Sequence, residues 1–395
     1  MRIAMVTTHP PSKGSLNEYA YHFARYLRLK SESASELFLL VDQLPAGQAY
    51  PDDVVEGSIP VTYIPCWKFG AIDNILRIQN TVKKLKPDIV LFNVQFATFA
   101  DKSIPATLGL LTPWLLKRSG FSTVVLLHNI METVNLKSAG FGGSFLNENV
   151  IRFFGSIVTR FLLSADLVAV TIPKYVDILT EKYKADNVIL APHGSFEEQT
   201  NIQPNTMPAG EPNIMTFGKF GTYKKVEILI EAFEMLLPQH PNAKLVIAGT
   251  DSPNVKGYLD GVQKQYSHVP NVQFTGYVSE EDVPRIFGDA WVVVFPYTST
   301  TGSSGVLHQA GGFGKAVALP NLGDLAELVQ EEGYDGEFFE PTDARSLYEA
   351  ISRVIDHPER QLEIGSTNFM AANGLPINDV VDWYLIHFQE LLKKK

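Results

Sequence analysis

The sequence predicts an α/β protein built from two Rossmann-like, parallel-sheet domains in tandem. Its 395 residues are too many for one ordinary core and suit two domains of roughly 150 to 200 residues each. Short runs rich in β-branched residues alternate with longer amphipathic segments, which is typical of β-α-β units. These runs lack polar alternation, as expected when helices cover both faces of a sheet.

The first domain is predicted at residues 1–195, with the strands RIAMVT, ELFLLVD, VTYIP, DIVLFN, TVVLLH, DLVAVT and NVILAP. Residues 196–212 are polar, contain prolines and show no period, which predicts a linker. The alternation restarts over residues 213–375 with NIMTFG, KLVIAG, NVQFTG, WVVVFP and KAVALP. The tail, residues 376–395, predicts a helix that packs back on the first domain through an apolar stripe of Trp383, Ile386, Phe388, Leu391 and Leu392.

Composition excludes several classes of protein. A formal net charge of −10 argues against a nucleic-acid partner. The single cysteine, Cys66, excludes an internal disulfide and fits a reducing compartment. No apolar run reaches the roughly 20 residues that span a bilayer, and the apolar run at the N-terminus is too short for a signal peptide. No histidine pair has a metal-binding spacing. We therefore expect a cytoplasmic protein without a bound metal.

Ligands of parallel sheets bind beyond the carboxyl ends of the strands, so functional residues are expected in the loops that follow the strands. In the second domain, NIMTFGKFGTYKKVEILIEAF places Gly218, Lys219 and Lys224 between a strand and a helix. Amides at a helix N-terminus together with lysine ammonium groups favour an anion such as phosphate. The alternative is that these lysines belong to a solvated face.

A second loop, YTSTTGSSGVLHQAGG, places Thr301 and the run Gly302, Ser303, Ser304 and Gly305 before a helix that carries Gln309. Small residues with accessible amides form a nest that suits an anion or a sugar ring. A tight turn with one serine as helix cap is the alternative. If both loops open on one sheet edge, they can hold a diphosphate without a metal.

The first domain offers fewer candidates. Gly14 and Ser15 lie between the first strand and the helix LNEYAYHFARYL, again at a strand-to-helix turn. His128 and Asn129 end the strand TVVLLH, where a histidine faces the ligand edge. A structural role for His128 is the open alternative.

Two motifs resemble those of the retaining glycosyltransferases of family 4, which have the GT-B fold of two Rossmann-like domains facing each other across a cleft. The pattern G-R-L-x-x-x-K-G-x-x-x-L-I-E-A-F is matched by Gly218, Lys219, Phe220, Lys224 and residues 229–233, and the run FTGYVSEEDVPRIFGDAWVVVFP matches the family's next motif. The resemblance is strong after residue 212 and looser before it.

The resemblance implies roles for these residues. Lys219, in place of the family's arginine, and Lys224 would grip the donor diphosphate. Tyr277 and Val278 would meet the nucleotide base. Gly14 and Ser15 resemble the family's Gly-Gly turn near the diphosphate, and His128 stands where the family has a histidine near the donor sugar.

This sequence departs from the family at two glutamates, eight positions apart, that commonly contact the donor sugar and the ribose. Thr301 and Gln309 stand in their places, so both charges are absent. Their side chains can still hydrogen-bond hydroxyl groups. Without a carboxylate nucleophile, the likeness to retaining enzymes favours same-face attack over double displacement.

The expected function is therefore the transfer of a hexose from a nucleotide-diphosphate sugar to a glycan, a glycolipid or a small acceptor. The transfer is expected to retain the configuration of the sugar and to need no metal and no cofactor besides the nucleotide-sugar co-substrate. A nucleotide-sugar-binding subunit that has lost catalysis is the alternative, and an epimerase on the same fold is a third reading.

Residues 75–86 and 141–165 are candidates for a peripheral contact with the inner membrane face. The other interpretation is that these residues form helices packed on the first sheet.

Overall fold

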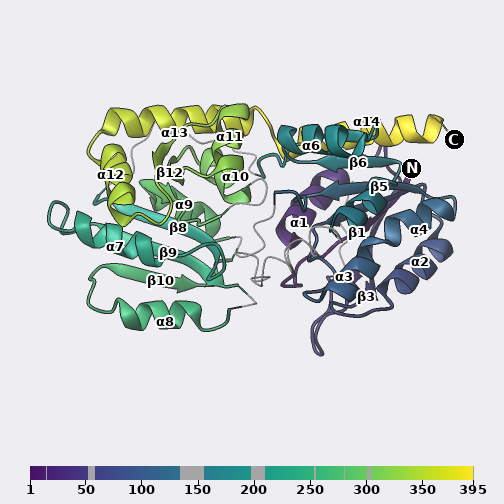
Figure 1. Ribbon diagram of the computed structural model, residues 1–395, viewed down its shortest axis with the longest axis horizontal. Helices are drawn as coiled ribbons and strands as arrows, with labels where there is room; N and C mark the ends of the chain where they lie inside the picture. Colours follow the sequence, from purple (N-terminus) through teal and green to yellow (C-terminus); the bar gives the residue numbers. More distant parts are fainter. Residues whose placement is uncertain are drawn as a thin grey trace. The chain divides into compact units, whose positions relative to one another are not determined.

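The computed structural model describes residues 1–14, 16–51, 58–133, 155–196, 210–252, 255–279, 281–299 and 304–394. Within them the chain divides into two compact units, each a parallel sheet flanked by helices (Figure 1). The first unit holds the described residues up to 133, those of 155–193 and those from 377 onward. The second unit holds the described residues of 194–376. The predicted α/β fold class of two Rossmann-like sheets is confirmed.

The first unit is built on a seven-stranded sheet with the strand order β3-β2-β1-β4-β5-β6-β7. The pairings between neighbours are parallel, and β4, β5 and β6 are buried along their whole length, which explains their lack of polar alternation. The strands are β1 (Arg2–Val6), β2 (Glu36–Asp42), β3 (Val61–Trp67), β4 (Ile89–Val94), β5 (Ser122–Leu127), β6 (Leu167–Val170) and β7 (Val188–Leu190). The helices are α1 (Asn17–Leu27), α2 (Asn74–Leu85), α3 (Ser103–Leu110), α4 (Thr112–Arg118), α6 (Pro173–Tyr183) and α14 (Ile377–Lys393).

The C-terminal helix α14 packs against α1 in the first unit. The Tyr384 ring meets the Phe23 ring of α1 edge-on, with 5.3 Å between centroids. The apolar stripe expected for this helix is corrected in part, because Trp383 and Ile386 are exposed while Val380, Val381, Tyr384, Leu385 and Phe388 are buried. The buried face is thus rotated from the expected one, and the Trp383 indole instead donates to the Leu190 carbonyl.

The second unit is built on a six-stranded sheet with the order β10-β9-β8-β11-β12-β13. Its strands are β8 (Asn213–Phe220), β9 (Lys244–Asp251), β10 (Val272–Gly276), β11 (Val292–Val294), β12 (Ala316–Pro320) and β13 (Glu337–Phe339). Its helices are α7 (Glu227–Leu236), α8 (Tyr258–Gln265), α9 (Val283–Asp289), α10 (Gly305–Gly312), α11 (Gly323–Glu331), α12 (Ala344–Ile355) and α13 (Pro358–Asn373). One buried cluster, which includes Phe220, Phe233, Ile247 and Leu347, joins β8 and β9 to α7 and α12.

Two glycines let the central strands β8 and β9 continue to the ligand edge. Gly218 pairs with Gly249, and both have positive φ angles, 135° and 138°. A Cβ atom on Gly249 would stand 1.9 Å from the Gly218 carbonyl oxygen. Both strands run two residues past this pair, to Phe220 and Asp251, so the close approach fixes the backbone that carries Lys219.

Replacing Gly249 with alanine should therefore lower the free energy of unfolding by about 2 to 4 kcal/mol, because the new methyl group meets backbone that cannot yield. Urea denaturation measures the change. Gly261→Ala is the matched control: Gly261 lies inside α8 with open space around it, so its replacement should be neutral or stabilise by about 0.5 to 1 kcal/mol. Equal effects of the two variants would contradict the steric explanation.

Candidate functional site

The second unit brings Lys224 beside Gly218, as the first motif predicts. A Cβ atom on Gly218 would lie 2.8 Å from the Lys224 Nζ, so glycine leaves room for the ammonium group. The boundaries differ from those expected: Gly218 and Lys219 lie within β8, and α7 begins only at Glu227. Lys219 is exposed, whereas Lys224 is half-buried.

Lys224 is held by backbone and by aromatic rings. Its Nζ lies 4.7 Å from the centre of the Tyr297 ring and 5.9 Å from that of Tyr223. Lys224 forms an isolated antiparallel bridge with Tyr297, and the Thr298 amide donates to the Tyr223 carbonyl at 2.8 Å. A cation over aromatic faces keeps its charge and remains able to bind an anion on its open side. Tyr297 and Tyr223, which the sequence motif did not indicate, thus define where the charge lies.

One amide at the helix start that was expected to bind this anion donates its hydrogen bond to another group. The Val226 amide donates to the Tyr258 hydroxyl at 2.9 Å, and that hydroxyl donates to the Glu227 carboxylate. The Nζ of the neighbouring Lys225 lies 4.8 Å from the centre of the Tyr258 ring. Lys224, and not Lys225, is therefore the lysine beside Gly218.

The second predicted loop reaches the same tyrosine. Ser304 is the N-cap residue of α10, which begins at Gly305, but its side chain makes no cap hydrogen bond; its carbonyl accepts from the Leu307 amide at 2.9 Å. Burial raises the pKa of the Tyr297 phenol, and the nearby Ser304 side chain offsets part of that rise. Tyr297 thus lies beside Lys224 and near the start of α10. Thr301, Gly302 and Ser303 lie outside the described residues.

The remaining candidates of the second unit occupy different environments. Gln309 is buried in α10, with only 2% of its surface exposed. Tyr277 follows the strand β10 with 79% of its surface exposed, and Val278 is half-buried beside it. An exposed ring at the carboxyl end of a strand is free to stack on a planar ligand. The structure itself assigns no ligand to it.

In the first unit, close packing at Gly14 leaves no room for a side chain. A Cβ atom there would lie 2.4 Å from Thr8 Cγ2, so the loop between β1 and α1 passes too close to the strand end for a side chain. The Gly14 amide donates to the Ser12 hydroxyl, which donates to the Asp42 carboxylate at 2.7 Å. The helix α1 starts at Asn17 rather than at Gly14, and Ser15 lies outside the described residues.

His128 directly follows β5 and is buried in a polar network at the carboxyl edge. Its Nε2 lies 2.6 Å from Asn93 Oδ1. The Asn93 amide group donates to Thr7 Oγ1, whose own proton goes to the Thr8 carbonyl. Asn93 Oδ1 must therefore accept, so the proton of the imidazole is on Nε2 and Nδ1 is left as an acceptor.

The surroundings keep this imidazole neutral. Burial lowers the pKa of His128 to about 3, and repulsion from His193 adds to the effect. The Tyr19 ring meets both histidines edge-on, at 4.8 Å from His128 and 4.9 Å from His193. His193 was not predicted as a site residue, and the polar residues Thr7 and Asn93 at the strand ends are the signal that could have indicated the network. Asn129 accepts from the Phe96 amide.

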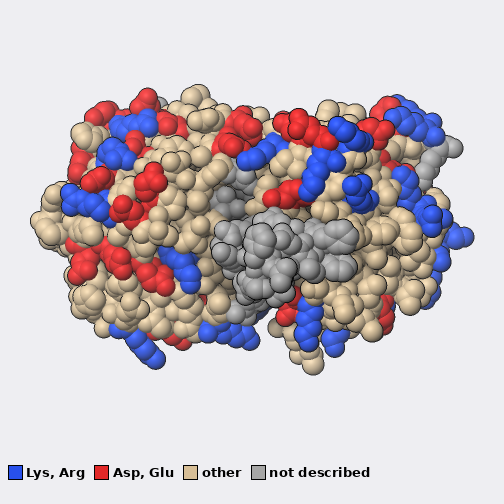
Figure 2. Space-filling view, in the orientation of Figure 1, with Lys and Arg blue, Asp and Glu red and all other residues tan. Residues whose placement is uncertain are grey.

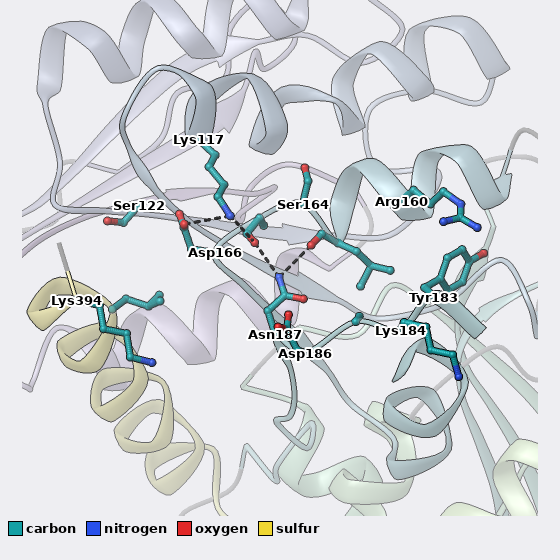
Figure 3. A pocket seen from close by; sticks show the side chains of 14 residues that line it. Lys117, Ser122, Arg160, Ser164, Asp166, Tyr183, Lys184, Asp186, Asn187 and Lys394 are labelled. Carbon is teal, nitrogen blue, oxygen red and sulfur yellow. Dashed lines mark hydrogen bonds and ion pairs between the residues drawn. The ribbon is translucent and has the colours of Figure 1, made fainter. Parts of the chain in front are cut away.

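A cavity among the described residues of the first unit is at the wrong edge for this chemistry. It has a volume of about 660 Å³ and is lined at the amino ends of β5, β6 and β7 by Lys117, Arg160, Lys184, Lys394, Asp166 and Asp186 (Figure 3). Lys117 lies 3.3 Å from the Asp166 carboxylate. Basic side chains also gather over this end of the unit on the surface (Figure 2). We call it the charged cavity.

Neither a metal site nor a membrane-spanning helix is found among the residues that the structure describes. Among the residues that the structure describes, no three His, Cys, Asp or Glu side chains come together as a metal site. Over the same part of the chain, every helix is too short or too polar to cross a bilayer.

Comparisons with known proteins agree with this geometry. Residues 211–357 match the family model for glycosyl transferases group 1. Over its full length the chain is 22% identical to the whole of an O-antigen chain mannosyltransferase of Escherichia coli. It is also 25% identical to a mannosylfructose-phosphate synthase of Agrobacterium fabrum, over half of each protein.

Solved structures show the same fold. A sucrose-phosphate synthase of Thermosynechococcus elongatus aligns over 100% of this chain and 99% of its own, with a TM-score of 0.74 and 18% identity. HepE of Anabaena, in complex with UDP-glucose, aligns over all of both chains with a TM-score of 0.68 and 15% identity.

The state of His128 predicts a pH dependence. Its folded pKa, about 3, lies below the ordinary value of 6.5, so the unfolded chain takes up its proton first as pH falls. The free energy of unfolding should fall between about pH 6.5 and pH 4, by at most about 1.4 kcal/mol per pH unit for this group. His128→Gln should make the slope shallower in urea titrations, whereas replacing the exposed His268 should not. An unchanged slope in His128→Gln would contradict the assignment.

The resemblance to glycosyltransferases is therefore confirmed, with the second unit containing the glycosyl transferases group 1 match and the whole chain having the GT-B fold.

Proposed function

We propose that this protein transfers a hexose from a nucleotide-diphosphate sugar to a glycan or glycolipid acceptor, with retention of configuration and without a metal ion. The observation that carries the proposal is the fixed position of the Lys224 ammonium group between Gly218 and the Tyr297 ring. Support for the substrates comes from the E. coli relative, an O-antigen chain mannosyltransferase, and from HepE, which was solved with UDP-glucose. Glycoconjugate synthesis is the corresponding process.

The chemistry requires the leaving diphosphate to be stabilised as its bond to the anomeric carbon breaks. A preformed cation does this without reorganising at the moment of reaction. We assign that role to Lys224, with Lys219 and the loop 302–305 as further donors. The neutral His128 would contact a hydroxyl of the donor sugar, because its Nδ1 is an acceptor.

Retention would follow from attack on the same face. Gln309, and Thr301 at the other position, provide no carboxylate for a covalent intermediate. In the proposed step the acceptor oxygen forms the new bond to the anomeric carbon while the bond to the diphosphate breaks. The acceptor's proton passes to a phosphate oxygen of the leaving group, so charge and atoms balance.

Replacing Lys224 with alanine should weaken binding of UDP or GDP by roughly 10- to 100-fold and reduce transfer at least as much, because a charge-assisted contact is lost. Thermal shift with each nucleotide and transfer from radiolabelled sugar donors measure the two effects. Lys225→Ala is the matched control, since Lys225 lies over Tyr258 instead.

Each outcome separates the alternatives. Unchanged nucleotide binding and transfer in Lys224→Ala would refute the phosphate site. Binding that depends on Lys224, without turnover of any donor in the presence of cell extract, would instead favour a nucleotide-sugar-binding subunit.

A lipid-linked acceptor is consistent with an apolar surface on the first unit. Phe69, Ile72 and Leu76, on the connection into α2 and its first turn, are between 54% and 65% exposed. Ile104, on α3, is 72% exposed, and α3 packs against α2. The exposed Lys68 and Lys102 flank these side chains in sequence. Apolar side chains beside cations fit the interface of an anionic bilayer.

The double variant Ile72→Ser/Ile104→Ser should reduce co-sedimentation with vesicles of phosphatidylglycerol by roughly tenfold, since the free energy of burying two large apolar side chains is lost. Ile386→Ser, which changes another exposed isoleucine, on α14 of the same unit, should leave it unchanged. Equal sedimentation of all three proteins would refute the membrane contact. The part of the candidate segment 141–165 that precedes residue 155 lies outside the described residues.

A further inference from the structure

A second cavity of the first unit differs from the charged cavity in its chemistry. It has a volume of about 740 Å³, and those of its lining residues that the structure describes are all uncharged. They include two amides, a hydroxyl, two phenol rings and a proline: Gln43, Gln48, Thr62, Tyr50, Tyr63 and Pro65. Gln43 directly follows β2, so the cavity opens at the carboxyl end of that strand and along the edge strand β3.

Two tyrosines form the aromatic part of this uncharged cavity. The rings of Tyr50 and Tyr63 stack at 5.3 Å with an angle of 10° between their planes. The Tyr50 hydroxyl lies 2.9 Å from the Asp42 carboxylate, and burial together with that carboxylate raises the pKa of the phenol. The His9 ring meets Tyr63 edge-on at 5.2 Å. Both rings are therefore fixed before any ligand arrives.

The uncharged cavity is joined to the loop that carries Gly14. Asp42 accepts from Tyr50 and also from the Ser12 hydroxyl, and Ser12 in turn accepts from the Gly14 amide. Two hydrogen-bonded residues, Asp42 and Ser12, thus connect Tyr50 of this cavity to the predicted site at the β1–α1 turn. This places the cavity at the ligand edge of the sheet, unlike the charged cavity.

The chemistry of the lining selects its ligand. A pyranose ring presents a face of C–H bonds, which packs on an aromatic ring, and a rim of hydroxyl groups, which pair with amides and hydroxyls. The exposed amides of Gln43 and Gln48 and the exposed hydroxyl of Thr62 provide such partners. None of the described lining residues carries a positive charge that could neutralise a phosphate or a carboxylate.

We propose that the uncharged cavity is a subsite for a neutral sugar residue of the acceptor glycan, beyond the residue that receives the transferred sugar. The inference rests on the proposed glycosyl transfer and deepens it, because it makes the acceptor an oligosaccharide. An added peptide strand is the competing occupant of an edge strand. Pro65 supplies no amide proton to such a strand, and the pairing of β2 with β3 shifts register after Val41, so this edge suits a peptide poorly.

The test uses the whole chain and neutral disaccharides as probes. Saturation-transfer NMR with α-mannobiose, maltose and lactose should show transfer to ring C–H protons for at least one of them, and none for glucose 6-phosphate. Thr62→Lys puts a charged chain into the cavity from an exposed position, so it should weaken that binding at least about tenfold without unfolding the protein. Tyr63→Ala should do the same by removing the ring.

Tyr183→Ala is the matched control, because it removes a tyrosine ring from the charged cavity (Figure 3) and should leave disaccharide binding unchanged. Equal binding to the Thr62→Lys variant and the unmodified protein, preference for glucose 6-phosphate, or no binding of any disaccharide would overturn the inference.

Failure of the subsite and failure of the proposed function give different results. Lys224→Ala should lose nucleotide binding and keep disaccharide binding, whereas Thr62→Lys should show the reverse. Disaccharide binding that depends on Thr62, in a protein that transfers no sugar, would leave the subsite in place and refute the transfer alone.

Discussion

The contact between the Lys224 ammonium group and the Tyr297 ring is the interaction on which the donor side of this protein depends. Tyr297 follows β11 and Lys224 follows β8, and these strands are neighbours in the sheet. A lysine on a flexible stem would otherwise lose considerable entropy when it binds an anion. Because the ring and the antiparallel bridge restrict it beforehand, the charge is already at the edge of the sheet.

Both sheets carry their candidate binding groups at the carboxyl ends of the strands, but the groups differ between the two sheets. In the second unit, the paired glycines Gly218 and Gly249 let two strands approach closely, and Gly218 leaves room for the Lys224 ammonium group. A cation at this edge suits an anionic ligand. In the first unit, a neutral imidazole, amides and phenol rings occupy the equivalent edge, and burial keeps the imidazole uncharged. The proposed donor site thus contains a fixed cation, whereas the described lining of the proposed acceptor subsite is neutral and polar.

Much of the architecture could be read from the sequence, because buried parallel strands leave continuous apolar runs. All seven strands of the first sheet were predicted, and five of the six in the second. The missing strand, β13, spans only Glu337–Phe339, too short to show a period. The sequence also located Gly218 and Lys224, but it could not reveal Tyr297 or Asn93, whose roles arise from pairing between distant segments. The face of α14 was misjudged because its partner α1 lies more than 300 residues away along the chain.

That return of α14 to the first unit also orders the events of synthesis. The described residues of the second unit come from one stretch, 194–376, and can pack together once that stretch has left the ribosome. The first unit, by contrast, contains residues on both sides of that stretch, and its helix α14 packs on Phe23 of α1. Until α14 has left the ribosome, that apolar side of α1 stays uncovered in the nascent chain, and a chaperone that shields it would protect the partly synthesised protein.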